Sequence, residues 1–296
     1  MDLMLLDGEG MKAHELGDLA QNRSFLYGDG VFESIRVMYG QALWPSFHFE
    51  RLQYGLKQLG IQYNQNLLQF EQQLQKLISI NKIHAGARIR VHVWRRTGGF
   101  YRPENDGGMQ LMQVLAMDSN EFTLNTKGLQ LGDSSITKQV LFQPDVKTTN
   151  ALQYVLAARE AKAANWDDAF LYHFEGGLLE SSSSNVFLLK QGVLLTPRLE
   201  DGCLPGIMRR VMIEKLPALG YTIKEQLLAH NDLQTADEVY LTNAISGLRW
   251  VAGWRSKRYF KKNASKLVDD LNQLALQSLT QVWLTKRQTC HGRIAK

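Results

Sequence analysis

Residues 176–187 read GGLLESSSSNVF, with four consecutive serines between the carboxylate of Glu180 and the amide of Asn185. Strand-like segments flank this stretch, AFLYHF (169–174) before it and NVFLLK (185–190) at its end. A flexible interdomain linker is usually bounded by Pro-rich or charged sequence, and neither flanks these serines. The serine run is therefore interpreted as a polar turn inside a β-structured unit, with its hydroxyl and amide groups available for binding.

The composition of the whole chain is that of a globular protein. It has 296 residues, of which 44% are apolar and 21% charged, enough for one large domain or two smaller ones. The net charge is +5, and the basic cluster at 255–262 holds too few aromatic residues to predict nucleic-acid binding. Two cysteines, Cys203 and Cys290, exclude a disulfide framework and offer no metal-ligand spacing. Without a basic signal-peptide start or a long apolar run, we expect a cytoplasmic protein with no membrane partner.

Apolar periodicity divides the chain into two units. Residues 1–118 are predicted to form a small N-terminal α/β domain, residues 119–127 (SNEFTLNTK) a polar linker, and residues 128–296 a larger C-terminal domain. In the first unit we predict strands at 31–40, 87–96 and 109–117 and helices within 47–61 and 66–80. In the second we predict strands at 136–142, 169–174, 176–180, 185–190, 193–197 and 237–244, and helices at 150–165, 204–216 and 265–285.

Four stretches of the second unit carry residues suited to cofactor chemistry. They are Lys147 in PDVKTTN, Glu180 before the serines, Pro205 and Gly206 at a helix start, and Thr242 with Asn243 at a strand end. A pyridoxal phosphate (PLP) enzyme needs an amine, a carboxylate for the pyridine nitrogen and a phosphate cradle, for which a helix N-terminus is suited. Each feature alone has an ordinary alternative: a surface lysine, a strand end or a helix cap.

The combination, in this order, resembles the class IV (fold type IV) PLP-dependent enzymes over about residues 20–255. That family comprises branched-chain aminotransferases, D-amino-acid aminotransferases and 4-amino-4-deoxychorismate lyases. The motifs that carry the resemblance are YGDGVFESIRV (27–37), HFERL (48–52), KTTNAL (147–152), LESSSSNVF (179–187), LLTPRLEDGCLPGIMRR (194–210) and YLTNA (240–244). The resemblance implies an α/β fold with a small N-terminal domain and a C-terminal pseudo-barrel, a PLP cofactor, a small amino substrate and a homodimer.

The resemblance also implies roles for individual residues. Lys147 matches the Schiff-base lysine and proton shuttle, and Glu180 the carboxylate that pairs with the pyridine nitrogen. The remaining cofactor contacts carried over are Arg51 and Thr242 to the phosphate, the backbone N–H groups of Ile207 and Met208 to the phosphate, and Ser184 with Asn185 under the ring. Many members have threonine where this chain has Met208, so a hydroxyl contact is lost there. Substrate contacts are expected from Tyr27, Phe32, Ser34, Arg90 and Asn243.

The activity within the family depends on the substrate-side residues. Lyases resemble this chain at the hydroxyl of Ser34, at a Gly-Gly pair like 98–99 and at the LTNA stretch 241–244, but they often have arginine where this chain has Phe100. Arg102 lies two residues further along the chain, and the sequence leaves open whether it contacts a substrate carboxylate. We therefore expect a 4-amino-4-deoxychorismate lyase, which forms 4-aminobenzoate and pyruvate for folate synthesis.

A branched-chain or broad-specificity amino acid aminotransferase is the alternative. Such enzymes resemble this chain at Tyr27, Phe32 and Arg90, but they typically have glycine at the position of Ser34 and tyrosine at that of Leu152. D-Amino-acid aminotransferases carry a histidine in the loop that here reads RRTGGFYRP, and this chain has none there. A protein without catalytic activity is the competing class, in which Lys147 and Glu180 would be ordinary surface charges.

Overall fold

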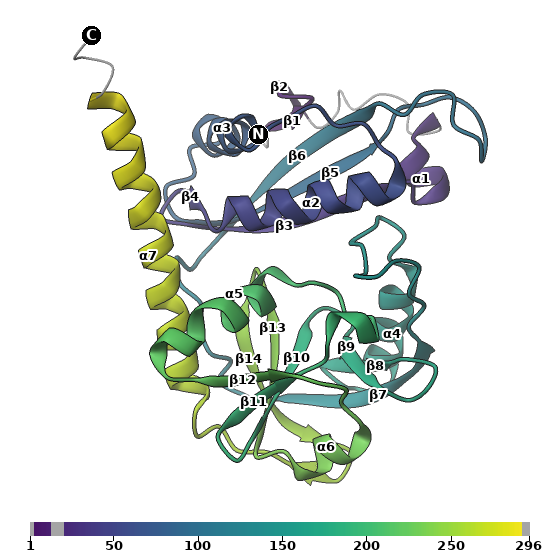
Figure 1. The fold of residues 1–296 in the computed structure, drawn as a ribbon, viewed down its shortest axis with the longest axis vertical. Coiled ribbons are helices and arrows are strands. Elements are labelled where there is room, and N and C mark those ends of the chain that lie inside the picture. Colours follow the sequence, from purple (N-terminus) through teal and green to yellow (C-terminus); the bar gives the residue numbers. More distant parts are fainter. Residues whose placement is uncertain (1–2, 13–20, 292–296) are drawn as a thin grey trace.

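The computed structural model describes residues 3–12 and 21–291 (Figure 1). The predicted domains also include residues 1–2, 13–20 and 292–296, which lie outside the described residues. One six-stranded sheet forms in the N-terminal half and one nine-stranded sheet in the C-terminal half. The two halves are stacked, and helix α7 (Ala264–His291) runs along one side of both (Figure 1).

The N-terminal sheet is antiparallel, with the order β2-β1-β6-β5-β3-β4. Its strands are β1 (Leu3–Leu6), β2 (Glu9–Lys12), β3 (Gly30–Met38), β4 (Gln41–Ala42), β5 (Gly86–Arg95) and β6 (Gly108–Met117). The period-2 alternation of β3 places Val31, Ile35 and Val37 in the core, where they pack with residues of the two long helices. The opposite face of β3 carries Phe32 and Ser34, so the same alternation places these two side chains in one wall of a cavity.

Two helices, α2 (Pro45–Leu59) and α3 (Leu67–Ile80), contribute the other side of this core. Proline at the first position of α2 fits a helix start, and Gly60 ends it in a left-handed conformation with φ of 65°. A capping box between Asn66 and Gln69 begins α3. The short helix α1 (Arg23–Tyr27) precedes β3.

The C-terminal sheet closes on itself as a pseudo-barrel. Strand β9 (Leu178–Ser181) pairs with both β8 (Asp168–Tyr172) and β10 (Asn185–Lys190), which completes a ring in the order β10-β13-β14-β7-β8-β9. The other strands are β7 (Leu129–Thr137), β11 (Val193–Thr196), β12 (Thr222–Glu225), β13 (Glu238–Asn243), β14 (Gly247–Trp254) and β15 (Lys257–Arg258). The helices are α4 (Leu152–Ala163), α5 (Ile207–Lys215) and α6 (His230–Thr235). Apolar side chains such as Phe170, Val186 and Trp254 fill the barrel.

The strand predicted at 136–142 is wrong in most of its length. Strand β7 ends at Thr137, and Lys138 begins an irregular segment because its amine turns into the interior to meet two carboxylates. The strand in the structure starts earlier, at Leu129. The sequence pattern did not indicate this start, because Gly132 interrupts the alternation that marks a strand. Glycine is required there because a Cβ would lie 2.1 Å from the Trp166 ring. Strand β14 was not predicted for a similar reason, since GLRWVAGW lacks regular alternation.

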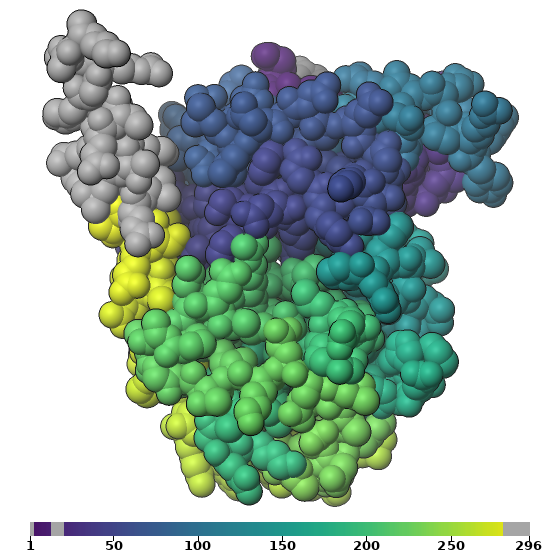
Figure 2. All heavy atoms as spheres, in the orientation of Figure 1, coloured from purple at the N-terminus to yellow at the C-terminus, as the bar shows by residue number. Residues whose placement is uncertain are grey.

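Figure 2 shows the boundary along which the blue N-terminal part meets the green C-terminal part. The stretch 119–127 is held against the protein, because Phe122 is buried and its N–H donates to Asn272 Oδ1 at 2.8 Å. None of the helices in the described part of the chain has the length and apolarity that crossing a membrane requires.

Candidate functional site

A cavity of about 710 Å³ lies where the two halves meet. It is lined by most of the predicted site residues: Phe32, Ser34, Arg51, Arg90, Lys147, Glu180, Ser184, Asn185, Ile207, Thr242 and Asn243. Tyr27 instead packs against Tyr101 and Arg23. The side chain of Met208 is buried in the core, while its backbone N–H, the group predicted to contact the phosphate, lies in the first turn of α5. The cavity therefore brings together residues far apart in the sequence.

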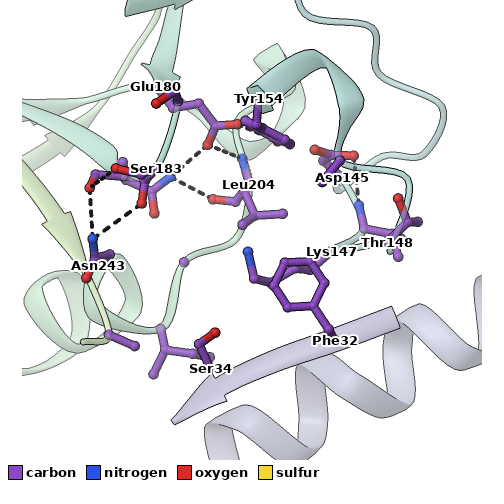
Figure 3. Close-up of a pocket in the computed structure, with 18 of the residues that line it drawn as sticks. Phe32, Ser34, Asp145, Lys147, Thr148, Tyr154, Glu180, Ser183, Leu204 and Asn243 are labelled. Carbon is purple, nitrogen blue, oxygen red and sulfur yellow. Dashed lines mark hydrogen bonds between the residues drawn. The ribbon is translucent and has the colours of Figure 1, made fainter. Parts of the chain in front are cut away.

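Lys147 is carried by a loop that docks on the free edge of β3. The N–H of Phe32 donates to the Lys147 carbonyl at 3.1 Å, and the N–H of Thr149 donates to the Gly30 carbonyl at 2.8 Å. The Lys147 amine lies 4.3 Å from the centroid of the Phe32 ring and forms no ion pair with any described residue. Figure 3 shows it pointing into the cavity between Phe32 and Leu204.

Burial lowers the pKa of Lys147 to about 8, and the nearby Arg51 guanidinium acts in the same direction. An ordinary lysine titrates near pKa 10.4, so at neutral pH it is almost wholly charged. With a pKa of about 8, roughly one Lys147 in ten is neutral at pH 7. The neutral amine is the nucleophilic and proton-accepting form.

This pKa predicts the pH dependence of Lys147 reactivity. In the apoprotein, where the Lys147 amine is free of PLP, the rate of its acetylation by acetic anhydride should rise about tenfold per pH unit below about pH 8 and level off above it, since only the neutral amine reacts. Competitive labelling followed by mass spectrometry of the Lys147 peptide measures this rate, with surface lysines as internal references. A rate that still climbs steeply up to about pH 10 would show that Lys147 titrates as an ordinary lysine.

Glu180 and Asn185 face each other across the β9–β10 hairpin, whose turn is the serine run. The Glu180 carboxylate accepts a hydrogen bond from the Leu204 N–H at 3.0 Å (Figure 3). It also accepts from the Tyr154 hydroxyl at 2.9 Å and the Asn185 amide at 3.3 Å, and it pairs with the Lys138 amine. A carboxylate that accepts this many hydrogen bonds beside a cation is fixed in place and stabilised as the anion.

Lys138 and Tyr154 are the partners that the sequence did not reveal. The Lys138 amine is buried, with Asp145 at 2.8 Å, the Gly202 carbonyl at 2.8 Å and Glu180 around it. Burial alone would lower the pKa of Lys138, but the Glu180 and Asp145 carboxylates raise it above its ordinary value. Lys138 and Glu180 are 42 positions apart, so no spacing in the sequence relates them.

The serine run lines the cavity and forms a hydrogen-bonded turn around Asp168. Ser181, Ser182 and Ser183 all donate their hydroxyls to the buried carboxylate of Asp168, at 2.9, 2.6 and 2.9 Å. Ser183 and Ser184 also connect to the next strand pair, because the Asn243 amide donates to the Ser184 hydroxyl at 3.0 Å and to the Ser183 carbonyl at 3.3 Å. The first three serines therefore fix the hairpin turn, which holds Glu180 and Asn185 in register.

The end of the cavity near α5 is suited to a phosphate. Helix α5 begins after Gly206 with no side-chain cap, so its first N–H groups are available to an anion. A Cβ at Gly206 would lie 1.8 Å from Asn185 Oδ1, so only glycine lets the backbone approach this closely. The buried hydroxyl of Thr242 has no hydrogen-bond partner in the structure and lines the same cavity. A ligand oxygen would satisfy that hydroxyl.

Arg51 lies on α2 and lines this end of the cavity. Its guanidinium donates to both carboxylate oxygens of Glu33, at 2.8 and 2.6 Å, and to the Pro205 carbonyl at 2.9 Å. Burial disfavours the charged form of Glu33, yet Arg51 and His48 lower its pKa to about 2. The Glu33 pair orients Arg51, whose planar fork keeps further N–H groups for an anion.

These features together fit one class of cofactor. An amine without an ion-pair partner, a fixed carboxylate and an anion-binding helix end at one cavity match what PLP requires of a protein. The arrangement therefore describes a PLP-dependent enzyme of fold type IV.

Comparisons with known proteins place the chain in a family. The model of the amino-transferase class IV family matches residues 30–254. The chain belongs to this family of PLP-dependent transaminases and lyases, and its cofactor is PLP.

The relatives differ in activity. A candidate branched-chain-amino-acid aminotransferase of Methanocaldococcus jannaschii is 31% identical over 76% of this chain and 78% of its own length. The aminodeoxychorismate lyase of Bacillus subtilis is 30% identical over 76% and 77%. A D-alanine aminotransferase of Listeria monocytogenes is 29% identical over 75% and 77%. The branched-chain aminotransferase structure of Thermoproteus uzoniensis superposes with a TM-score of 0.87 at 22% identity, over 94% of this chain and 96% of that one, which confirms the fold.

Proposed function

We propose that the protein is a 4-amino-4-deoxychorismate lyase. The observation that carries this proposal is the hydroxyl of Ser34 in the wall of the cavity that holds Lys147. Ser34 occupies the position at which lyases resemble this chain and branched-chain aminotransferases differ from it. The lyase reaction removes one proton from the amine-bearing ring carbon, returns one to the departing enolpyruvyl group, and leaves 4-aminobenzoate and pyruvate.

The residues of this chain divide the work of that reaction. When bound, PLP supplies an aldehyde for the substrate amine and a ring that accepts electrons. Lys147, whose pKa is about 8, is suited to accept a proton from the amine-bearing carbon and return one at neutral pH. Glu180 would face the pyridine nitrogen as an anion held by Lys138 and Tyr154. Arg51, Thr242 and the start of α5 would hold the phosphate.

Ser34 is suited to orient the departing group. Its hydroxyl accepts a hydrogen bond from the Arg88 guanidinium at 3.2 Å, which leaves its own O–H free to donate into the cavity. Phe32 lies on the same face of β3 as Ser34, and its ring packs against the Lys147 amine. The hydroxyl therefore lines the same cavity as the Lys147 amine.

Replacing Ser34 tests the proposal. Ser34→Gly should lower kcat for 4-aminobenzoate formation by about 10- to 100-fold, because one oriented hydrogen bond to the reacting substrate is lost. Ser34→Thr keeps the hydroxyl and should retain most activity. The yellow absorbance of bound PLP should be unchanged in both variants, since Ser34 contacts neither Lys147 nor Glu180 in the described hydrogen bonds. Unchanged 4-aminobenzoate formation in Ser34→Gly would sink the role of this residue.

An amino acid aminotransferase is the second candidate, because a candidate branched-chain-amino-acid aminotransferase is 31% identical to this chain over 76% of its length. Branched-chain aminotransferases carry tyrosine where this chain has Leu152, and Leu152 is exposed here. The hydrogen bond from Tyr154 to Glu180 supports the cofactor carboxylate and is compatible with both activities. Release of a keto acid with no 4-aminobenzoate, on incubation with an amino acid, would favour this candidate.

A further inference from the structure

Two turns of the C-terminal half meet in one wall of the cavity. The first is the serine run at 181–184, and the second is the turn at 243–246, between β13 and β14. Asn243 joins them, because its amide donates to the Ser184 hydroxyl at 3.0 Å while its side-chain oxygen accepts from two N–H groups of its own turn, at 3.0 and 2.8 Å. The position of each turn therefore depends on the other.

Arg249 lies behind this wall. It belongs to β14, the strand that follows the second turn, and its side chain does not line the cavity. Its Nη2 donates to the Ser184 hydroxyl at 3.3 Å and to the Ser183 hydroxyl at 3.4 Å. The side chain is only 26% exposed, and its Nε is buried without a hydrogen-bond partner. The contacts of this guanidinium are therefore directed at the serine run.

A buried anion explains why a cation is held at this place. Arg249 Nη2 lies 3.8 Å from Oδ2 of the buried Asp168, which is too long for a hydrogen bond but close enough to balance its charge. Asp168 already accepts from the hydroxyls of Ser181, Ser182 and Ser183. The carboxylate therefore has its hydrogen bonds without Arg249, whose own N–H groups are available to the serine hydroxyls.

These contacts restrict the direction in which Ser184 can donate. A hydroxyl has two acceptor lone pairs and one O–H, and the lone pairs of Ser184 are taken by Asn243 and Arg249. Its remaining contact is the Ser183 hydroxyl at 3.5 Å, at the limit of a hydrogen bond. Ser184 is buried and lines the cavity, so a ligand atom in the cavity would be the better acceptor for its O–H.

We propose that Arg249 is a positioning residue, which fixes the Ser184 hydroxyl as a hydrogen-bond donor to PLP. A cation that donates to a hydroxyl polarises it and strengthens the hydrogen bond that the hydroxyl donates in turn. The effect of Arg249 on the cofactor runs through Ser184, because the arginine itself lies outside the cavity lining. The inference goes beyond the proposed function, since it applies to a lyase and to an aminotransferase alike.

PLP titration of the apoprotein, followed by the yellow absorbance of the bound cofactor, tests this role. Arg249→Met should raise the dissociation constant of PLP about tenfold, because the Ser184 hydroxyl is no longer oriented or polarised. Arg249→Lys keeps a cation that can donate to the serine hydroxyls, and it should recover most of the affinity. Ser184→Ala should weaken PLP binding by a similar factor of about ten.

A double-mutant cycle separates this role from a general loosening of the wall. If Arg249 acts through Ser184, Arg249→Met should weaken PLP binding by less than about threefold in the Ser184→Ala background, whereas independent effects would multiply to about 100-fold. Arg255→Met is the matched control, because Arg255 directly follows β14, pairs with Asp133 at 2.7 Å and lies outside the cavity lining. Its PLP affinity should equal that of the unmodified protein.

Unchanged PLP affinity in Arg249→Met, or losses that multiply in the double variant, would overturn the inference, as would an equal loss in Arg255→Met. Should Arg249→Met fail to fold, Arg249→Gln takes its place in the cycle, and the same outcomes decide. The result is independent of turnover. If 4-amino-4-deoxychorismate is not converted but the cycle shows coupling between Arg249 and Ser184, the proposed function fails and the inference stands.

Discussion

Lys147→Ala should lower turnover by at least about 10³-fold, because a single side chain supplies both the cofactor attachment and the proton transfer. Its amine lies in the cavity without an ion-pair partner among the described residues, and its pKa of about 8 suits both tasks. Steady-state assay with the amino substrate measures the loss. Circular dichroism should be unchanged, since the Lys147 side chain forms no hydrogen bond within the described structure and its loop is held by backbone contacts.

Lys127→Ala is the matched control, because Lys127 is exposed and remote from the cavity lining. It should retain full activity and cofactor absorbance. More than about a tenth of the normal turnover in folded Lys147→Ala would contradict the catalytic role, given the contribution that proton transfer normally makes.

Lys138→Met should lower the free energy of unfolding by about 3 kcal/mol, because breaking a buried charge pair leaves the remaining charge without compensation. Here two carboxylates, Glu180 and Asp145, would lose their shared cation. Denaturant unfolding of the apoprotein measures the change without contribution from the cofactor. The same substitution should weaken PLP binding, since the Glu180 carboxylate loses the buried cation that holds it in place.

Lys266→Met offers a control of the same chemistry at the surface. Lys266 pairs with Asp270 at 2.9 Å but is two-thirds exposed, so its loss should cost much less stability than the loss of Lys138. The pH dependence adds a second check. Burial already raises the pKa of Asp145 against the opposing effect of Lys138, and removing this cation raises it further, so the extra loss of stability should be small near about pH 4 and grow toward about pH 8. Equal stability of Lys138→Met and the unmodified protein at about pH 8 would contradict the buried ion-pair network.

The elements of the fold were largely predictable from local patterns. Alternation in β3 and helical spacing in α2 and α3 are properties of neighbouring residues, and the structure confirms them. The resemblance to class IV enzymes, confirmed by the family match, supplied the fold that periodicity alone could not. Strand β14 and the start of β7 were missed because glycines interrupt their alternation.

The support around the site could not be predicted in the same way. Lys138 reaches Glu180 across 42 positions, and its sequence neighbours ITKQV give no sign of a buried cation. The serine run was recognised as a functional turn, but its partner Asp168 lies on β8 and became visible only in the structure. Arg88 and Arg90 are two positions apart in the sequence, but it became visible only in the structure that neither has an acidic partner among the described residues.

The central claim is that Lys147 holds PLP in the cavity between the two halves. Borohydride reduction of the PLP-loaded enzyme, followed by digestion and mass spectrometry, shows which lysine carries the cofactor. We predict a phosphopyridoxyl group on the peptide that contains Lys147, and none on that containing Lys138, whose amine is occupied by Glu180 and Asp145. A label on any other lysine, or none on Lys147, would contradict the account.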